Sequence, residues 1–115
     1  MTEDQLRDAR RALGTAQACA SGQLSAIEAC WSLSLLAHSL PQLLSGDDRN
    51  LFVGVESETD ALPVGKLKEN WHPDYLPAKM EQLNRYEGTI PGDVRSACER
   101  LITALETELA KVEPQ

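Results

Sequence analysis

Apolar residues recur at steps of three and four along most of the chain, which is the spacing of one face of an α-helix. The first such helix starts at a capping box made by Thr2 and Gln5. A second capping box, Ser25 with Glu28, opens the next helix, which Pro41 ends or kinks. Because the apolar residues of this second helix surround much of its circumference, we expect it to be the central and most buried element.

The C-terminal half carries two further helical stripes. Pro73 suits the first position of a third helix, and the apolar residues behind it are Leu76, Met80, Leu83 and Tyr86. Residues 88–92, GTIPG, break that pattern. The clearest stripe of the chain follows and consists of Val94, Cys98, Leu101, Leu105, Leu109 and Val112. The sequence therefore predicts an all-α fold, a four-helix bundle-like domain that spans residues 1–115.

Residues 52–65 read FVGVESETDALPVG and interrupt the helical pattern with acidic residues, glycine and proline. Residues 51–55 have the composition of a strand, but the run is short, contains Gly54 and has no second strand to pair with. We therefore predict extended chain here, within one long irregular acidic loop between the second and third long helices. A short helical turn over residues 66–69 is expected after Pro63.

Composition narrows the class of protein. With 115 residues, of which 42% are hydrophobic and 4% aromatic, the chain can form one core built from aliphatic side chains. Its formal net charge of −7 disfavours nucleic acid and anionic membrane surfaces as partners, and it favours a basic protein. The most apolar stretch, residues 26–44, contains too many polar residues for a membrane span. We expect a cytoplasmic protein without a targeting signal.

Three cysteines, Cys19, Cys30 and Cys98, lie far apart in sequence within predicted helices. An odd number at such spacing does not indicate a disulfide framework, and a reducing compartment fits best. We interpret all three as small buried apolar side chains.

Carboxylates in the acidic segment are the main candidates for chemistry. In an extended chain Glu56, Glu58 and Asp60 would share one face, where they could bind a hard cation, act as general acid and base, or attract a basic protein. Their spacing does not match an EF-hand loop. In the structural alternative, Thr59 or Asp60 caps a turn after Pro63 and the glutamates form a solvated face.

The rest of the chain offers little to complete a catalytic site. No serine lies in a nucleophile motif, and the sequence has no glycine-rich phosphate loop. His38 and His72 have no cysteine or carboxylate at metal-ligand spacing, and we interpret both as structural histidines. We expect no catalytic residue, no cofactor and no metal ion.

Three segments together resemble a family of small bacterial proteins. They are G-x-x-S-x-x-E-A-C at residues 22–30, F-x-G-x-x-S-E-T-D-x-L-P-V-G at 52–65, and W-x-P-x-x-L at 71–76. The resemblance covers residues 21–102, and it implies no particular reaction. In size and charge such proteins are similar to immunity proteins, which block a cognate toxin. The residues that the resemblance groups into one unit are Ser57, Glu58, Thr59, Asp60, Leu62, Pro63, Gly65 and Trp71.

Three hypotheses for function follow. The first is a protein-binding inhibitor of immunity type, whose acidic surface neutralises a basic bacterial toxin or nuclease. The second is a structural or regulatory helical module that acts as a homodimer, and the third is a carboxylate-based metal-binding or hydrolytic domain. In the first, carboxylates supply charge and two aromatic residues anchor the contact, although Trp71 has the alternative role of a core plug beneath the loop. The predicted partner-binding residues are Asp47, Asp48, Glu56, Glu58, Asp60, Trp71 and Tyr75.

Overall fold

The computed structural model describes residues 1–64 and 69–112, except for the side chains of Ala37 and Pro91. Its elements are α1 (Glu3–Ala20), α2 (Ala26–Leu33), α3 (Leu36–Ser39), the 3-10 helix η1 (Pro41–Leu43), α4 (Gly46–Thr59), α5 (Leu76–Glu87) and α6 (Pro91–Val112). No strand occurs within these described ranges. The all-α prediction is therefore confirmed, whereas the predicted bundle with a long loop is not the observed arrangement.

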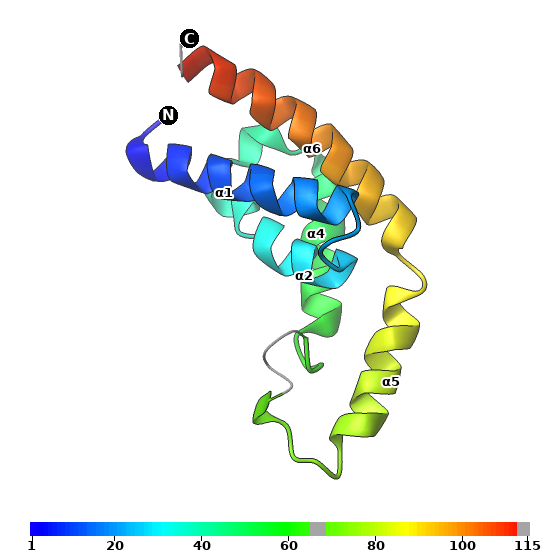
Figure 1. The fold of residues 1–115 in the computed structure, drawn as a ribbon. Helices are drawn as coiled ribbons and strands as arrows, with labels where there is room; N and C mark the ends of the chain where they lie inside the picture. The colour runs from blue at the N-terminus through cyan, green and yellow to red at the C-terminus, as the bar shows by residue number, and fades with distance from the viewer. Residues whose placement is uncertain (65–68, 113–115) are drawn as a thin grey trace.

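Two long helices, α1 and α6, lie side by side and run in opposite directions (Figure 1). Helix α2 packs against both α1 and α4, and it occupies the central place that the sequence predicts for it. The N-terminus and the end of α6 lie at the same end of the molecule (Figure 1).

The core is aliphatic, as the composition predicts. Helix α1 turns small residues inward, and α6 turns larger ones, so the two helices can pack closely. The buried residues of α1 are Ala9, Ala12, Ala16 and Cys19. Those of α6 are Val94, Ala97, Cys98, Leu101, Leu105 and Leu109. Phe52 from α4 is the largest fully buried side chain in the described ranges.

Helix α1 begins as the sequence predicts. The amide of Gln5 donates to the hydroxyl of Thr2 over 3.1 Å, and the amide of Thr2 donates to the side-chain oxygen of Gln5 over 3.0 Å. At the start of α2, the hydroxyl of Ser25 accepts from the amide of Glu28 over 3.1 Å. These bonds satisfy amides that have no partner inside the first turn of a helix.

The predicted continuous second helix is wrong, because α2 ends at Leu33 and the chain turns before α3 begins at Leu36. At the break, the hydroxyl of Ser34 donates to the carbonyl of Trp31 and also to the carboxylate of Glu56 on α4. Such side-chain bonds compete with regular helix geometry. The next residue, Leu35, is left 65% exposed.

The predicted acidic loop is also wrong, because residues 46–59 form helix α4 and the expected extended segment lies inside it. The hydroxyl of Ser45 accepts from the amide of Asp48 over 3.1 Å and caps the helix. Asp47 and Asp48 lie in the first turn, where carboxylates are favoured by the helix dipole. The buried residues of α4 follow helical spacing and are Asp48, Phe52, Val55 and Thr59.

Helix α5 begins at Leu76 with Pro77 in its first turn, three residues later than Pro73 suggested. Its predicted apolar face is confirmed, with Leu83 buried and the other three members half-buried. The chain turns after α5, as expected, and α6 starts at Pro91, inside the segment 88–92 that was predicted to separate the two helices. The turn predicted over residues 66–69 lies mostly outside the described residues.

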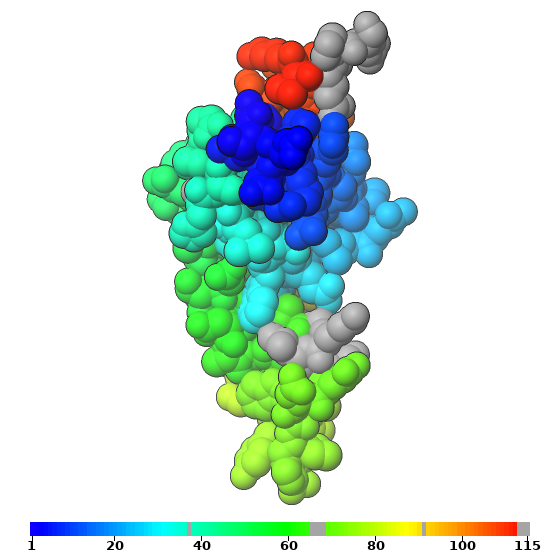
Figure 2. All heavy atoms as spheres, turned by 90° about the vertical axis from the view of Figure 1, so that its left-hand side faces the viewer, coloured from blue at the N-terminus to red at the C-terminus, as the bar shows by residue number. Residues whose placement is uncertain are grey.

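The molecule measures 53 × 26 × 23 Å. Its radius of gyration of 15.2 Å exceeds the roughly 13 Å expected for a compact chain of this length. Helix α5 and residues 69–75 extend away from α1, α2 and α6 toward the end opposite the two termini (Figures 1 and 2). No helix in the described ranges is both long and apolar enough to cross a membrane.

Candidate functional site

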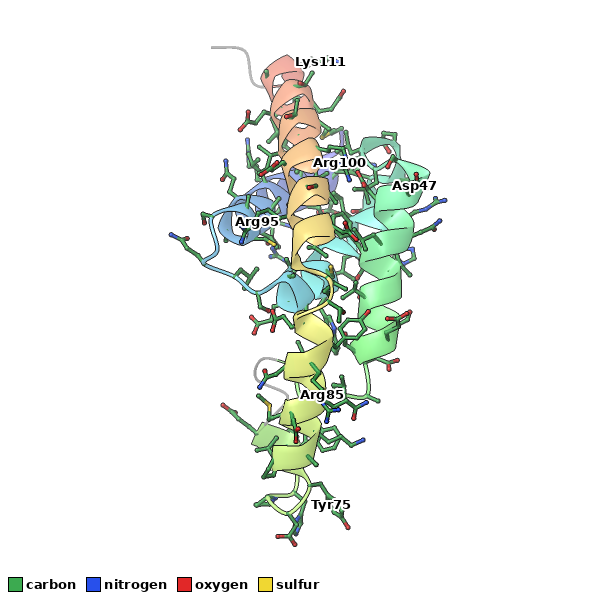
Figure 3. All side chains as sticks on the ribbon, turned by 90° about the vertical axis from the view of Figure 1, so that its right-hand side faces the viewer. Asp47, Tyr75, Arg85, Arg95, Arg100 and Lys111 are labelled. Atoms are coloured by element: carbon green, nitrogen blue, oxygen red, sulfur yellow. The ribbon has the colours of Figure 1, made fainter. Side chains whose placement is uncertain are left out.

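The acidic residues that the sequence singles out are distributed along α4, and one of them is part of the folded interior. Asp48 is buried and accepts two hydrogen bonds from Arg100 of α6, one from Nε over 3.0 Å and one from Nη2 over 2.7 Å. Arg100 lies between α6 and α4 (Figure 3). Its hydrogen bonds hold the pKa of Asp48 below the usual value of 3.8. Asp48 therefore joins two helices, and its proposed role in partner binding is withdrawn.

The inner side of α4 is fixed to α2 by polar contacts. Thr59 is fully buried, and its hydroxyl donates to the carbonyl of Val55 over 2.7 Å and accepts from Trp31 Nε1 over 2.8 Å. Thr59 is thus the last residue of a helix, and the turn after Pro63 that Thr59 or Asp60 was expected to cap lies mostly outside the described residues. Half-buried Glu56 accepts from the hydroxyl of Ser34.

The outer side of α4 carries the carboxylates that stay accessible. Exposed Glu58 accepts a hydrogen bond from the hydroxyl of Tyr86 on α5, and burial together with this carboxylate raises the pKa of Tyr86 to about 12. Asp47 and Asp60 are exposed at the two ends of the helix. Within the described residues, no cation lies at ion-pair distance from Asp47, Glu58 or Asp60.

The helical geometry overturns the predicted shared face of three carboxylates. At about 100° per residue, Glu56 and Asp60 lie one turn apart on the same side, and Glu58 lies on the other side. Asp47 is about 20 Å away from Asp60 along the axis, at 1.5 Å per residue. The carboxylates therefore share no common face: exposed Asp47 lies at the start of α4, and exposed Glu58 and Asp60 lie near its other end on different sides of the helix axis.

The two predicted aromatic anchors lie beyond the end of α4, in a segment that we call the tip, residues 71–75. Tyr75 is 66% exposed and stands at the far end of the molecule from Lys111 (Figure 3). Its ring meets that of His72 edge to face, with centroids 5.9 Å apart, and Nδ1 of His72 accepts from the amide of Asp74 over 3.1 Å. Trp71 is half-buried, which is intermediate between the exposed anchor and the buried core plug that were the two roles predicted for it.

Metal binding finds little support in this arrangement. Residues 1–64 and 69–112 contain no group of three or more histidine, cysteine, aspartate or glutamate side chains that could hold a metal ion. Nδ1 of His72 lies 3.6 Å from a carboxylate oxygen of Asp74, and both side chains are exposed on the tip.

A hollow that the sequence did not predict lies between α1 and the α2–α3 segment. It measures about 420 Å³. His38, predicted to be a structural histidine, is exposed on its wall. No local pattern indicates this hollow, because its walls come from helices that meet only after folding. Six of its lining residues are Asp8, Arg11, Ala12, Ser32, Leu36 and His38.

Comparison with protein-family models, with curated proteins and with solved structures finds no match for this chain. The fold and the contacts above are therefore the basis for the proposals that follow.

Proposed function

We propose that the chain is a protein-binding inhibitor of immunity type that neutralises a basic bacterial toxin or nuclease in the cytoplasm. The observation that carries the proposal is the tip, where Tyr75 is 66% exposed at the end of an extended molecule. An exposed tyrosine combines a large apolar ring with a hydrogen-bonding hydroxyl, and such residues dominate the binding energy of protein interfaces.

Charge supports the same proposal. The net charge of −7 and the exposed carboxylates Glu58 and Asp60, on the part of α4 nearest to α5, would attract a cationic partner and speed its association. The proposed partner-binding set keeps Glu58, Asp60, Trp71 and Tyr75, with Asp47 at the remote end of α4. Half-buried Glu56, which accepts a hydrogen bond from Ser34, leaves the set together with Asp48. A basic active site that binds phosphates is a natural target, because carboxylates can take the place of phosphate oxygens.

The test uses two variants with the same change in net charge. Glu58→Lys with Asp60→Lys alters the proposed surface, and Glu99→Lys with Glu106→Lys alters exposed positions on α6. The wild type and the two double variants are each used to capture partners from the native host. The captured partner is then titrated against each variant. We expect the first pair to weaken binding by roughly tenfold or more and the second pair to weaken it much less.

Two further measurements complete this test. Helical circular dichroism should be retained in both double variants, since neither removes a buried group. Co-expression of the wild type should protect a host cell from the captured protein. Recovery of no basic protein, or equal binding by both double variants, would count against the proposal.

A homodimer is the second candidate, and one observation favours it. Leu35 is 65% exposed on the wall of the 420 Å³ hollow, which Ala12 and Leu36 also line. In a two-fold symmetric dimer, Leu35 of each copy would enter the hollow of the other. Sedimentation at micromolar concentration should then show a dimer that Leu35→Ser converts to a monomer. A wild-type monomer at that concentration excludes this candidate.

A further inference from the structure

Three cysteines from three helices meet in the core. Cys19 on α1, Cys30 on α2 and Cys98 on α6 are all buried free thiols. Cys19 and Cys98 lie close enough across the α1–α6 contact for their thiols to hydrogen-bond. Cys30 is close enough to interact electrostatically with both, but it has no such bond.

One of the two bonded thiols faces a hollow. Cys19, in the last turn of α1, lines a hollow of about 180 Å³ together with residues from the 22–26 segment, Glu87 at the end of α5 and Arg95 on α6. Arg95 lies on the side of the molecule opposite Asp47 (Figure 3). Cys98 and Cys30 do not line this hollow. Cys19 is thus the thiol nearest to solvent, and Cys98 lies behind it.

The surroundings favour ionisation of the thiol that faces the hollow. The hydrogen bond from Cys98 and the positive charge of Arg95 lower the pKa of Cys19 to about 7, although burial and Glu87 oppose them. Burial raises the pKa of Cys30 to about 12, and the bond to Cys19 raises the pKa of Cys98. Cys19 is therefore the most readily ionised thiol of the group, and thiolates are the reactive form.

We propose that Cys19 and Cys98 form a peroxide-reactive pair, in which Cys19 is oxidised through the hollow and Cys98 resolves it to an intramolecular disulfide. The Cys19 thiolate attacks one oxygen of a hydroperoxide, so an S–O bond forms, the O–O bond breaks, and the leaving oxygen takes a proton. The thiol of Cys98 then attacks the sulfenic sulfur of Cys19. An S–S bond forms, the S–O bond breaks, and water leaves with the proton of Cys98.

The overall reaction oxidises two thiols by two electrons and reduces one hydrogen peroxide to two waters. The product ties the end of α1 to α6 and leaves Cys30 as a thiol. Thiol–disulfide exchange with a cellular dithiol would restore the reduced form. The reaction is independent of the proposed binding function.

The first test treats the native protein with hydrogen peroxide. We expect its mass to fall by two hydrogens and the change to reverse with dithiothreitol. Trypsin leaves Cys19 and Cys30 in one peptide, residues 12–49, so a second cleavage after Glu28 is needed to separate them. This second cleavage also cuts after Glu99, so the expected product links the Cys19 peptide to the Cys98 peptide, residues 96–99. A cross-link through Cys30, or no cross-link, overturns the proposal.

Cysteine variants assign the order of reaction. Cys30→Ser is the matched control and should form the same disulfide. Cys98→Ser should stop at the sulfenic acid of Cys19, which dimedone traps, and Cys19→Ser should give neither product. The assigned order would be overturned if dimedone labelled Cys98 in the Cys19→Ser variant as fast as it labels Cys19 in the Cys98→Ser variant.

Two charge variants separate this chemistry from simple opening of the fold. Arg95→Gln should slow the reaction of Cys19 several-fold near pH 7, because it removes the charge that stabilises the thiolate. Glu87→Gln should speed it, because it removes the charge that opposes the thiolate. Both changes should fade above pH 9, where Cys19 is ionised in every variant. If both variants change the rate in the same direction, loosened packing is the cause and the proposal fails.

Discussion

Asp48 and Arg100 connect the first turn of α4 to the middle of α6 through two hydrogen bonds. Thr59 connects the last turn of the same helix to α2 through Trp31. Each bond pairs a polar side chain at a position where an unpaired polar group would lower the free energy of unfolding. At the scale of single residues, α4 is therefore held at both ends by specific polar contacts with two different helices.

The Asp48–Arg100 pair should make stability depend on pH. Because the pKa of Asp48 is lowered from 3.8 in the folded state, its contribution is complete above about pH 4 and is lost as the pH falls through the folded-state pKa. We expect Asp48→Asn to lower Tm by a few degrees at pH 7, and the difference from wild type to shrink below pH 4. Thermal unfolding followed by circular dichroism between pH 2 and 7 measures both effects.

The control for this experiment is Glu106→Gln, which removes an exposed carboxylate from α6 and should leave Tm at pH 7 nearly unchanged. A Tm difference for Asp48→Asn that is the same at pH 2 and pH 7 would show that the ion pair does not contribute.

Thr59→Val keeps the shape of the side chain and removes the hydroxyl that bonds Trp31 Nε1 and the carbonyl of Val55. We expect the free energy of unfolding to fall by about 1–2 kcal/mol, because the indole N–H loses its partner in a half-buried place. Urea unfolding in a Trp71→Phe background, where emission reports Trp31 alone, measures it.

Thr103→Val is the matched control for Thr59→Val. Thr103 is exposed on α6, and its hydroxyl makes the same kind of bond to a carbonyl one turn earlier. Its removal should cost about 0.5 kcal/mol or less. Similar losses for the two substitutions would show that the bond to Trp31 adds nothing.

At the scale of elements, the start of a helix could be predicted where all the residues that form its cap are neighbours in the sequence. Thr2 and Ser25 were identified as caps because Gln5 and Glu28 follow three residues later, as in a capping box. No cap was predicted at Ser45, where Asp48 stands at that spacing, and the acidic sequence with Gly54 favoured a loop. Burial of Phe52 against other helices outweighs that local preference, and such tertiary effects are not visible in composition.

Ser45→Ala tests whether the cap of α4 determines its stability. The substitution removes the hydroxyl that accepts from the amide of Asp48, and we expect a loss of about 1 kcal/mol in the free energy of unfolding. Ser57→Ala, on the exposed side of the same helix, should cost nothing or stabilise slightly, because alanine favours helix. Equal effects of the two serine substitutions in urea unfolding would contradict the capped helix.

At the scale of the whole molecule, the important contacts join residues that are distant in sequence. Asp48 and Arg100 are 52 residues apart, and Trp31 and Thr59 are 28 apart. No pattern along the chain pairs them, because the pairing depends on how α4 packs against α2 and α6. The sequence could therefore predict the acidic residues and the exposed tyrosine of the candidate site, but not which carboxylates the fold would use internally.

Helix α5 should open more easily than the rest of the fold. Among the described residues, Leu83 is the only buried side chain on α5, whereas α6 buries six. We expect amides of α5 to exchange with deuterium through local openings. The free energy of these openings should be lower than that of the openings that expose α6, by roughly 2 kcal/mol or more. Native-state hydrogen exchange at pH 7 measures the difference. Equal protection would mean that α5 and α6 unfold as one unit.

The bond from Tyr86 to Glu58 provides a direct test of how α5 is held, because it joins the end of α5 to α4. Tyr86→Phe should lower the protection of α5 further and leave that of α6 unchanged, since the hydrogen bond that is removed joins α5 to α4. Tyr75→Phe is the control, because its exposed hydroxyl makes no hydrogen bond within the described residues. A selective effect of Tyr86→Phe would show that the carboxylate of Glu58 sets the position of the helix that carries the tip. A partner that engages Glu58 would then free the tip to adjust to its surface, at a free-energy cost no greater than that of opening α5.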